Sequence, residues 1–532
     1  MSLQITQNRL ARIKQLMHQG AFDIAQFESA KCLLDDEFNV EIRLIMSRLC
    51  DRAGKYQSAV QYALQAEKLL TGSSDWHEVL AVSGQLANLG EEQAAFACLG
   101  LISIDLDKNL PGATEIAKQY QILEGYEQAL NWLALAEAHR VNLPQVTELR
   151  GLIHMFNGDL ASSEIELEKS IVEHENPGIT PHILLSMLGS NADARIDRLK
   201  TLHGNSRFPP QEQSFLNYAL FKELDSTGQV DQAWEYLSTA SALRRKEVSY
   251  SSELENIAFD ELIAATKDFA IGGDSSSKDT ATPIFIIGMP RSGTSLLESV
   301  LANDDGIAAC GELTVVHSQL QFVLNRKIRN PFDLEMIKAL PGLDYAQWGR
   351  RYLEKANWKT GGKPFFIDKN PGNFNYAGLI AKALPFAKII NLVRHPVDVC
   401  FSNLKEVFVP SYYPYSYTQE ECANHYKNYK RLMAHWHQVA PGRILDVAYE
   451  NLVSQPAVEL QRVQKFCGLA ANPYQTKSRN TAHVSNSAST VQLREPVHKR
   501  NINGWRRYEK HLAAMEELLQ SDCDEYVRNF LV

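Results

Sequence analysis

Small residues recur through the first half of the chain at steps close to 34 residues. They fall at Ala25, Ala59, Ala95, Ala129, Ser163 and Ala233. The last step is about double the others and spans one degenerate copy near residues 190–200. Apolar residues around each copy have the spacing of helices. The period therefore predicts pairs of helices that stack on their neighbours to bury their apolar faces.

The copies share a local pattern, Gly-x-Φ-x-x-Ala, in which Φ is an aromatic or apolar residue. It is clearest in GAFDIA from Gly20, in GKYQSA from Gly54 and in GQVDQA from Gly228. The period and the pattern resemble the tetratricopeptide repeat, in which the small residue lets two antiparallel helices pack closely. The resemblance implies six recognisable repeats and a seventh, degenerate one within residues 1–250.

The purpose of such an array stays open at the level of sequence. A superhelix of stacked repeats has a concave surface, and surfaces of this kind commonly bind other chains. That favours a protein or peptide as partner. The alternatives are an array that only buttresses the next domain, or one that forms a homodimer.

Residues 251–282 connect the array to a second domain. A helix is expected over about residues 251–269, and IGGDSSSKDTAT, which starts at Ile271, has the composition of a flexible linker. The sequence thus predicts three parts. These are helical repeats over 1–250, a helix and linker over 251–282, and a second domain over 283–532.

The second domain opens with PIFIIGMPRSGTSLL, residues 283–297. An apolar run stops at Gly288, and helical spacing begins about four residues later. This order predicts a buried strand, a tight turn and a helix. Backbone N–H groups at such a turn, together with the positive end of the helix dipole, converge on an anion. The stretch is therefore a candidate binding site.

The turn differs from the loop of nucleoside triphosphatases. In the pattern G-x-x-x-x-G-K-[ST] a lysine follows the second glycine, but here Thr294 follows Gly293. The cation lies instead inside the loop, as Arg291, so ATP or GTP hydrolysis is disfavoured. The stretch resembles the 5′-phosphosulfate loop of sulfotransferases, P-R-[ST]-G-[ST]-[ST], which binds 3′-phosphoadenosine 5′-phosphosulfate (PAPS).

Further polar residues follow apolar stretches of the second domain. Glu312 lies in CGELTVV. A strand that ends around Lys369 is expected in KPFFIDKNPGN, and one that ends at Arg394 in AKIINLVRHP. Another strand is expected before Tyr449, in RILDVAYENLV. A mostly helical insertion is expected over about 314–360. Strands separated by helical patterns, with polar residues past their carboxyl ends, predict a parallel α/β sheet that binds ligands along that edge.

Arg394 and Ser402 lie eight residues apart, one at a strand end and one on the next helix. This arrangement resembles the sulfotransferase motif for the 3′-phosphate, whose arginine can bind phosphate bidentately. Taken in order with PRSGTS, CGE, DKNP and YENLV, it extends the sulfotransferase resemblance over about residues 283–510. The expected fold class is α plus α/β. A tetratricopeptide-like helical superhelix precedes a P-loop-like parallel α/β sulfotransferase domain.

Within that group, the number of residues between Arg291 and Glu312 and the CGE context look most like those of the tyrosylprotein sulfotransferases and their bacterial repeat-bearing relatives. The resemblance implies that the 5′-phosphosulfate is bound by Arg291, Ser292, Gly293, Thr294 and Ser295. It implies that Glu312 is the catalytic base and that Lys369 stabilises the transferring group. It also implies that Arg394 and Ser402 hold the 3′-phosphate and that Tyr449 contacts the nucleoside. STVQLREPVH resembles the family's loop that closes over PAPS, which implies a role for Ser489 in catalysis and donor binding and for Gln492 in donor binding.

The chain departs from the family pattern at two positions. Gly504 stands where the family has a basic residue before a tryptophan, although Arg506 and Arg507 follow Trp505 closely enough to substitute. Glu406 stands where a basic residue would follow the 3′-phosphate serine. A carboxylate there should weaken phosphate binding unless it points away.

Several of these residues also have structural alternatives. Tyr449 could pack beside the sheet, Lys369 could be a solvated strand-end lysine, and Glu312 could cap or pair structurally. The tyrosine-rich stretch SYYPYSY, residues 411–417, is equally consistent with a loop that covers substrate and with plain packing.

Composition excludes some classes of function. The net charge of −9 gives no reason to expect a nucleic-acid binder, which would carry a basic domain. No apolar run reaches membrane-spanning length and no signal-peptide core is present, so no membrane partner and a cytoplasmic location are expected. The eight cysteines are scattered without C-x-x-C pairs, which argues against disulfides and a zinc site.

The chemistry of sulfuryl transfer fits these assignments. A hydroxyl is a poor nucleophile at neutral pH, so a carboxylate must accept its proton, and Glu312 is the candidate. Arg291, Lys369 and Ser489 can stabilise the charge of the transferring group, and no metal is required. The sequence therefore predicts a PAPS-dependent sulfotransferase, with peptide tyrosine favoured as acceptor by resemblance. The alternatives are sulfation of a glycan or small metabolite, and an inactive repeat scaffold.

Overall fold

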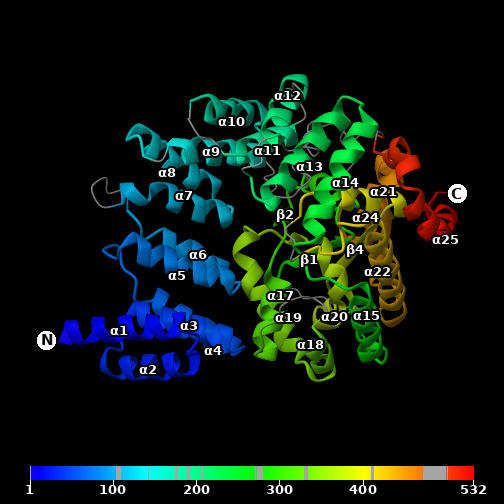
Figure 1. Ribbon diagram of the computed structural model, residues 1–532. Helices are drawn as coiled ribbons and strands as arrows, with labels where there is room; N and C mark the ends of the chain where they lie inside the picture. The colour runs from blue at the N-terminus through cyan, green and yellow to red at the C-terminus, as the bar shows by residue number, and fades with distance from the viewer. Residues whose placement is uncertain are drawn as a thin grey trace. The chain divides into compact units, whose positions relative to one another are not determined.

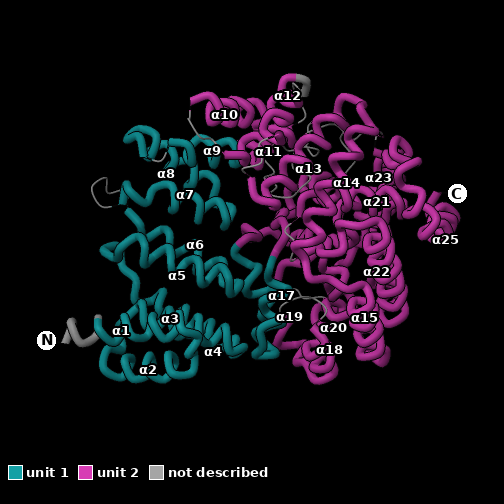
Figure 2. Tube along the Cα trace, viewed as in Figure 1, with its two compact units in different colours: residues 1–153, 314–329, 350–358 teal, residues 154–313, 330–349, 359–532 magenta. Residues whose placement is uncertain are grey.

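The computed structural model describes residues 2–103, 109–141, 143–173, 178–188, 192–204, 208–269, 271, 280–328, 333–408, 412–470, 499 and 501–531. A helical N-terminal region precedes a parallel-sheet domain, which confirms the predicted α plus α/β fold class (Figure 1). The chain forms two compact units that do not follow chain order (Figure 2). Unit 1 contains residues 1–153, 314–329 and 350–358, and unit 2 contains 154–313, 330–349 and 359–532.

Helices of the N-terminal region follow one another through short connections. They are α1 (Ser2–His18), α2 (Phe22–Asp35), α3 (Val40–Arg52), α4 (Tyr56–Glu67), α5 (Trp76–Asn88), α6 (Glu92–Leu99), α7 (Ala113–Ile122), α8 (Tyr126–Ala138), α9 (Leu143–Asn157), α10 (Leu160–Glu173), α11 (Thr180–Leu188), α12 (Ala192–His203), α13 (Pro210–Ser226) and α14 (Val230–Arg245). Consecutive helices pack together, as α3 does with α4 and α13 with α14.

The six recurring small residues are completely buried. Each is the fourth residue of its helix: Ala25 in α2, Ala59 in α4, Ala95 in α6, Ala129 in α8, Ser163 in α10 and Ala233 in α14. The glycines of the pattern have a separate role. Gly20, Gly54 and Gly228 have φ values of 77°, 74° and 80°, a conformation that side chains disfavour. The pattern therefore records one backbone requirement and one packing requirement.

The degenerate copy near residues 190–200 contains an arginine at the position of the small residue. Arg195 is the fourth residue of α12, and it is 2% exposed. Its Nη1 donates to the carbonyl oxygen of Leu185 at 2.8 Å, and it forms ion pairs with Glu164 and Glu223. A long buried side chain thus replaces close helix contact, which explains why the copy lacks the small-residue pattern.

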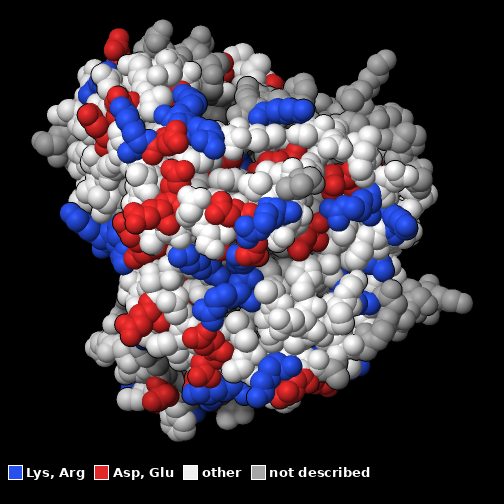
Figure 3. Space-filling view, turned by 90° about the vertical axis from the view of Figure 1, so that its right-hand side faces the viewer, with Lys and Arg blue, Asp and Glu red and all other residues white. Residues whose placement is uncertain are grey.

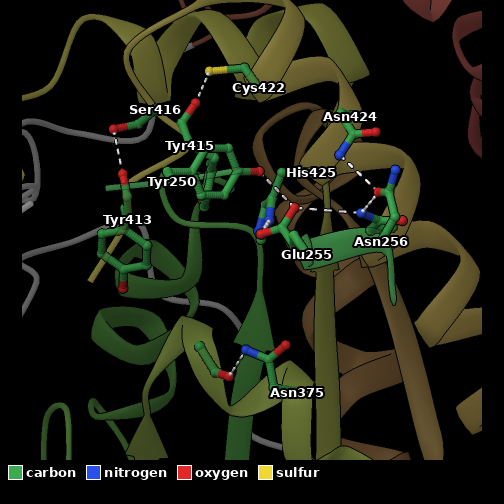
Figure 4. Close-up of polar contacts among 12 residues, drawn as sticks. Tyr250, Glu255, Asn256, Asn375, Tyr413, Tyr415, Ser416, Cys422, Asn424 and His425 are labelled. Carbon is green, nitrogen blue, oxygen red and sulfur yellow. Dashed lines mark hydrogen bonds and ion pairs between the residues drawn. The ribbon is translucent and has the colours of Figure 1, made fainter. Parts of the chain in front are cut away.

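Helix α15 (Ser252–Thr266) matches the helix expected before the linker, and most of the linker, residues 272–279, lies outside the described residues. This helix packs on α22 (Gln419–Val439). Glu255 accepts a hydrogen bond of 2.9 Å from the ring of His425, and Thr266 bonds His435 at 2.8 Å. Figure 4 shows Tyr250 and Asn256 beside Glu255 and His425. Helix α15 is therefore fixed to unit 2 by buried polar contacts.

The sheet consists of five parallel strands in the order β2-β3-β1-β4-β5. The strands are β1 (Thr282–Gly288), β2 (Ile307–Ala309), β3 (Phe365–Lys369), β4 (Lys388–Val393) and β5 (Ile444–Ala448). Sequence reasoning gave four of them and missed β2. That strand has only three residues, Ile-Ala-Ala, which is too short for a recognisable pattern.

Helices surround these strands in the chain. They are α16 (Thr294–Leu301), α17 (Val315–Leu324), α18 (Leu334–Ala339), α19 (Tyr345–Ala356), α20 (Ala377–Ala383), α21 (Pro396–Leu404), α22, α23 (Tyr449–Ser454), α24 (Pro456–Cys467) and α25 (Ala513–Phe530). Helices α17 to α19 confirm the predicted helical insertion. The core of the sheet is built from apolar side chains such as Ile284, Ile286, Ile367, Ile390 and Val447. Burial on both faces is typical of a parallel sheet.

Part of the insertion belongs to unit 1. Gln57 of α4 donates from Nε2 to the carbonyl oxygen of Phe322 in α17 at 2.8 Å. Lys355 of α19 pairs with Glu91 at 2.6 Å. Gly90 lies so close to α17 that an added Cβ would be 2.3 Å from Ser318. The turns of the first helices therefore bind a segment that lies more than 200 residues away in the chain.

The surface gives no sign of a basic domain on the face shown in Figure 3. Lys and Arg side chains there are interspersed with Asp and Glu, and no large patch of one sign stands out among the described side chains. A search of the helices in the described part of the chain found none with the length and apolar character needed to span a membrane.

Candidate active site

The predicted phosphate loop connects β1 to α16 at the carboxyl edge of the sheet. Gly288 and Gly293 have φ values of 143° and 111°. A Cβ at Gly288 would lie 2.5 Å from the carbonyl oxygen of Leu392, and one at Gly293 would lie 2.6 Å from the ring of Tyr449. Both positions therefore require glycine. Between them Arg291 has a φ of 67°, an uncommon conformation for a residue with a side chain.

Two side chains hold the backbone of this loop. Arg394, directly after β4, donates from Nη1 to the carbonyl oxygen of Arg291 at 3.0 Å. Asn403 of α21 donates from Nδ2 to the carbonyl oxygen of Pro290 at 2.8 Å. The structure thus brings the loop and the predicted 3′-phosphate arginine together. Sequence reasoning missed Asn403, although it follows Ser402 directly.

The part of the site around Arg394 and Tyr449 is buried. The side chain of Arg394 is 9% exposed, and its guanidinium lies 4.6 Å from the ring centre of Tyr449. Tyr449 therefore contacts both Arg394 and Gly293, so it is part of the site rather than only of the sheet packing. Ser402 is buried on α21, next to the asparagine that holds the loop.

Several buried donors of this region can accept an anion. Ser292 Oγ, Arg394 Nε and His395 Nδ1 have no hydrogen-bond partner among the described residues. Thr294 and Ser295 lie buried in the first turn of α16. A buried polar atom without a partner is costly, and phosphate or sulfate oxygens would satisfy Ser292 and Arg394. The residues present therefore fit the phosphate groups of PAPS.

Glu406 does not point away from the loop. It is 5% exposed, its Oε2 lies 3.7 Å from Nε of Arg291, and its Oε1 accepts from Nζ of Lys222 at 3.2 Å. Burial alone would raise the pKa of this carboxyl, but Lys222 and Arg291 together hold it below its ordinary value. Burial also lowers the pKa of Arg291, an effect that Glu406 opposes. The departure from the family pattern thus lies inside the site.

Lys405 is a further cation that sequence reasoning missed. Burial lowers its pKa, and the nearby charges of Arg394 and Arg291 act in the same direction. Its Nζ lies 5.0 Å from the ring centre of Phe401. A basic residue therefore does follow Ser402, one position before Glu406.

The two C-terminal arginines expected to substitute for a basic residue at Gly504 have partners of their own, and the expectation stays a prediction. Arg507 is half-exposed and bonds Asp225 of α13, with 3.0 Å between the charged groups. Arg506 is exposed and lies over the ring of Trp505. Side chains of this segment also lie near the site, because the ring of Trp505 stacks on His395 with 5.9 Å between ring centres. Burial lowers the pKa of His395, and the charge of Arg506 acts in the same direction. The backbone contributes as well. The N–H groups of Asn503 and Trp505 donate to Asp398 of α21 at 2.8 and 3.1 Å.

The predicted catalytic pair lies at the ends of β2 and β3. Lys369 donates from Nζ to Oε1 of Glu312 at 2.6 Å. The lysine side chain is 2% exposed and that of Glu312 is 36% exposed. Lys369 is therefore not a solvated strand-end lysine. Its backbone N–H also donates to the carbonyl oxygen of Gly311 at 2.9 Å, which fixes the CGE turn on β3.

The two groups share one edge of the sheet. Lys369 on β3 is level with Ile286 on β1, two residues before Gly288. The turn that carries Glu312 is tied to the helix after the phosphate loop, because Glu298 of α16 accepts from the N–H of Gly311 at 3.2 Å. Sequence reasoning missed Glu298, whose helical position gave no sign of its role. The carboxyl ends of β1, β3, β4 and β5 thus carry the phosphate loop, Lys369, Arg394 and Tyr449.

The tyrosine-rich stretch contains both buried and exposed tyrosines. Tyr415 and Tyr417 are 2% exposed, and Tyr415 stacks on His425 with 3.5 Å between ring centres. The hydroxyl of Tyr415 donates to Asn403 Oδ1 at 3.1 Å, so this packing supports the loop residue. Tyr412 is 73% exposed. Burial raises the pKa of Tyr413, and the charge of Glu312 adds to that effect, which places Tyr413 near the carboxylate.

Two predicted residues cannot be assigned a place. Ser489 and Gln492 fall in 471–498, outside the described residues. A search of the described His, Cys, Asp and Glu side chains found no group of three or more that could hold a metal ion.

Residues 283–473 match the family model described as Sulfotransferase family. This segment is therefore similar to the domains of that family. It begins at β1, and it includes the phosphate loop, Glu312, Lys369, Arg394 and Tyr449.

Similar proteins extend this comparison. An uncharacterized protein of Aquifex aeolicus (strain VF5) is 27% identical over 389 residues, which cover 70% of this chain and 50% of that protein. A Caenorhabditis briggsae protein provisionally named as a protein-tyrosine sulfotransferase is 24% identical over 194 residues, or 35% of this chain and 65% of that protein. The chain thus spans between half and two thirds of the length of these relatives.

Solved sulfotransferase structures also align with the chain. The sulfotransferase domain of the Synechococcus PCC 7002 olefin synthase aligns with a TM-score of 0.31 and 20% identity, over 44% of this chain and 91% of that domain. The sulfotransferase from Alicyclobacillus acidocaldarius aligns with a TM-score of 0.27 and 16% identity, over 46% of this chain and 97% of that protein.

Proposed function

We propose that the protein transfers the sulfuryl group of PAPS to an acceptor hydroxyl, with a tyrosine of a protein or peptide as the favoured acceptor. The observation that carries the proposal is the Glu312–Lys369 pair, at 2.6 Å, on the sheet edge that also bears the phosphate loop. PAPS supplies an activated sulfuryl group attached to a phosphate leaving group. The chain must supply a base, cations and a fixed geometry.

Glu312 is the proposed base. Lys369 holds one carboxylate oxygen, and the partial exposure of Glu312 leaves the group accessible to an acceptor. As the acceptor oxygen bonds to sulfur, its proton passes to Glu312 and the sulfur–oxygen bond to the phosphate breaks. The electron pair of that bond leaves with 3′-phosphoadenosine 5′-phosphate. Lys369 is buried next to the base, where a fixed cation can stabilise the charge that develops.

The donor is held at the neighbouring strand ends. Arg291 and the residues Ser292 to Ser295 would bind the 5′-phosphosulfate, and Arg394 with Ser402 the 3′-phosphate. Tyr449, which stacks under Arg394, would contact the nucleoside. Ser489 and Gln492, which lie outside the described residues, are proposed to contact the donor by resemblance to the family.

The proposed acceptor class is supported by fewer observations than the proposed donor. A relative at 24% identity bears the name of a protein-tyrosine sulfotransferase, which supports tyrosine. Purified protein should therefore be incubated with radiolabelled PAPS and a panel of tyrosine peptides, simple phenols and sugars. Label on peptide tyrosine supports the proposal. Label on sugar alone would favour sulfation of a glycan. If the protein binds the donor but labels no acceptor, an inactive scaffold is favoured.

We also propose that the tetratricopeptide-like helices bind the acceptor protein, or else a second copy of the chain. Helix α2 supports a binding role, because Ile24, Phe27, Leu34 and Phe38 on and just after it are 52 to 87% exposed. Exposed apolar groups of this kind mark interaction surfaces. Phe27→Ser should raise KM for a protein acceptor and leave a small phenol unaffected. A change in sedimentation coefficient without a change in KM would indicate the homodimer instead.

A further inference from the structure

A buried chain of alternating charges connects helix α13 to the phosphate loop. Lys222 of α13 bonds Glu406 at 3.2 Å, and Glu406 lies 3.7 Å from Arg291. The side chains of Glu406 and Arg291 are 7% and 9% exposed, and that of Lys222 is 23% exposed. The middle member is thus a carboxylate in contact with the arginine that the donor should occupy.

The site needs a negative charge when it is empty. Arg394 bonds the backbone of Arg291 at 3.0 Å. Burial lowers the pKa of Lys405, the charges of Arg394 and Arg291 lower it further, and Asp225 and Glu406 oppose them. Buried cations at such short range repel one another, and water screens them poorly. Glu406 stays ionised, because Lys222 and Arg291 hold its pKa low. It therefore supplies a permanent counter-charge at this point.

The same charge competes with a bound anion. One guanidinium cannot give its full interaction to a carboxylate and to a phosphosulfate at once, and the two anions repel each other. Lys222 already offers Glu406 a second cation, and its side chain is more exposed than that of Arg291. When an anion takes Arg291, Glu406 therefore keeps a charged partner.

We propose that Glu406 is an internal counter-anion of the donor site. It occupies Arg291 in the empty site, and Lys222 retains it when the 5′-phosphosulfate takes the arginine. The inference rests on the proposed function, since it assumes an anionic donor at Arg291. It makes Lys222, a residue of the helical region, a positioning residue for donor binding.

The mechanism predicts opposite effects for the two ends of the pair. A ligand binds more weakly when its binding-competent state is only partly populated, and more tightly when the competing state is removed. Glu406→Gln removes the competitor, so donor affinity should increase. Lys222→Met removes the alternative partner, so Glu406 depends on Arg291 alone and donor affinity should decrease. Each change should be roughly fivefold or more, the lower end of coupling between sites.

Two other roles for Glu406 give different signs. If Glu406 orients Arg291 for the donor, both substitutions weaken binding. If the pair only joins α13 to the sheet domain, neither changes binding once the protein is folded. The sign for Glu406→Gln therefore separates the three.

The experiment is calorimetric titration of the full-length chain with 3′-phosphoadenosine 5′-phosphate. The variants are Glu406→Gln, Lys222→Met and the double variant, which removes both charges of the pair and so strands no buried ion. Glu421→Gln is the matched control, because Glu421 pairs with Arg245 of α14 at 2.8 Å, in the same compact unit. Thermal unfolding of each variant shows whether it is folded.

We expect tighter binding by Glu406→Gln and by the double variant. Lys222→Met should bind more weakly, and the control should bind like wild type. Should Glu406→Gln fail to fold, the double variant decides by the same sign. Binding by either folded variant that is equal to or weaker than wild type overturns the inference. A wild-type chain that does not bind the nucleotide at all would refute the proposed function instead.

Discussion

Two buried glutamates of unit 2 each lie 3.7 Å from an arginine, yet their pKa values move in opposite directions. Glu223 belongs to the helical region, and neither of its oxygens has a hydrogen-bond partner among the described residues. Burial raises its pKa to about 7, although Arg195 opposes the change. Glu406 belongs to the sheet edge. It accepts from Lys222 and from the backbone N–H of Val407, and its pKa is lowered.

The difference shows that burial does not decide the charge of a carboxylate; the donors around it do. The helical region tolerates a glutamate whose pKa is raised to about 7, so that it keeps its proton in acidic solution. The sheet edge keeps Glu406 ionised between the cations of Lys222 and Arg291. Lys222 and Glu223 are neighbours on α13, so one helix contributes to both regions.

The sharpest separation of the two regions should come from Glu312. Glu312→Gln keeps the size of the side chain and removes the proposed base, so transfer should fall roughly 100-fold or more. Binding of 3′-phosphoadenosine 5′-phosphate should stay near the wild-type value. Initial rates with saturating donor measure the first effect, and calorimetry the second.

A matched control is available on the surface. Glu525 is 44% exposed and pairs with Lys430 at 2.7 Å, much as Glu312 pairs with Lys369. Glu525→Gln should leave the rate unchanged. Comparable losses in both variants would mean that Glu312 acts only through stability.

The next largest effect should come from the donor side. Arg394→Ala removes a buried cation, and charged hydrogen bonds contribute about 1.5–3 kcal/mol each, so affinity for 3′-phosphoadenosine 5′-phosphate should fall roughly tenfold to 100-fold. Adenosine 5′-phosphate, which lacks the 3′-phosphate, should lose much less. Equal losses for the two nucleotides in calorimetry would remove Arg394 from the 3′-phosphate site.

Sequence reasoning was most successful where the determinants are local. The strand, the turn glycines and Arg291 lie within 15 residues, and CGE and DKNP each place one member of the Glu312–Lys369 pair next to a strand. Strand β2 was missed because three residues give no periodicity. Lys222 could not be found at all, because its role depends on a contact with Glu406, which lies 184 residues later.

The same limit applies to the C-terminal arginines. Their proximity to Trp505 in sequence gave no sign that Arg507 bonds Asp225, 282 residues earlier. Ion pairs of this kind are set by tertiary packing, to which spacing along the chain gives no guide. Glu406 was recognised as unusual from sequence, but its contact with Arg291 needed the structure.

The smallest effect concerns Glu223 and depends on pH. Its pKa is raised in the folded chain, so the folded state keeps the proton while the unfolded chain releases it near the ordinary value of 4.5. Stability should therefore decrease as pH rises from about 5 to about 7. Glu223→Gln cannot ionise. Relative to wild type, the variant should thus be more stable at pH 7.5 than at pH 5, with a free energy of unfolding that is larger by about 2 kcal/mol.

Urea unfolding at the two pH values measures this difference. Donor affinity should be unaffected by Glu223→Gln, in contrast to Glu406→Gln. A relative stability that does not vary with pH would show that Glu223 is ionised in the folded chain, and the two glutamates would no longer differ.

The most direct test of the central claim is a single turnover with PAPS in which the sulfur is radiolabelled. Enzyme in excess over PAPS is mixed with a tyrosine peptide, and two products are counted together: label bound to the peptide and 3′-phosphoadenosine 5′-phosphate released. The proposed function predicts equal amounts of the two, formed at a rate that collapses in Glu312→Gln. Nucleotide release without label on a hydroxyl of any acceptor, or the same rate in both proteins, would contradict it.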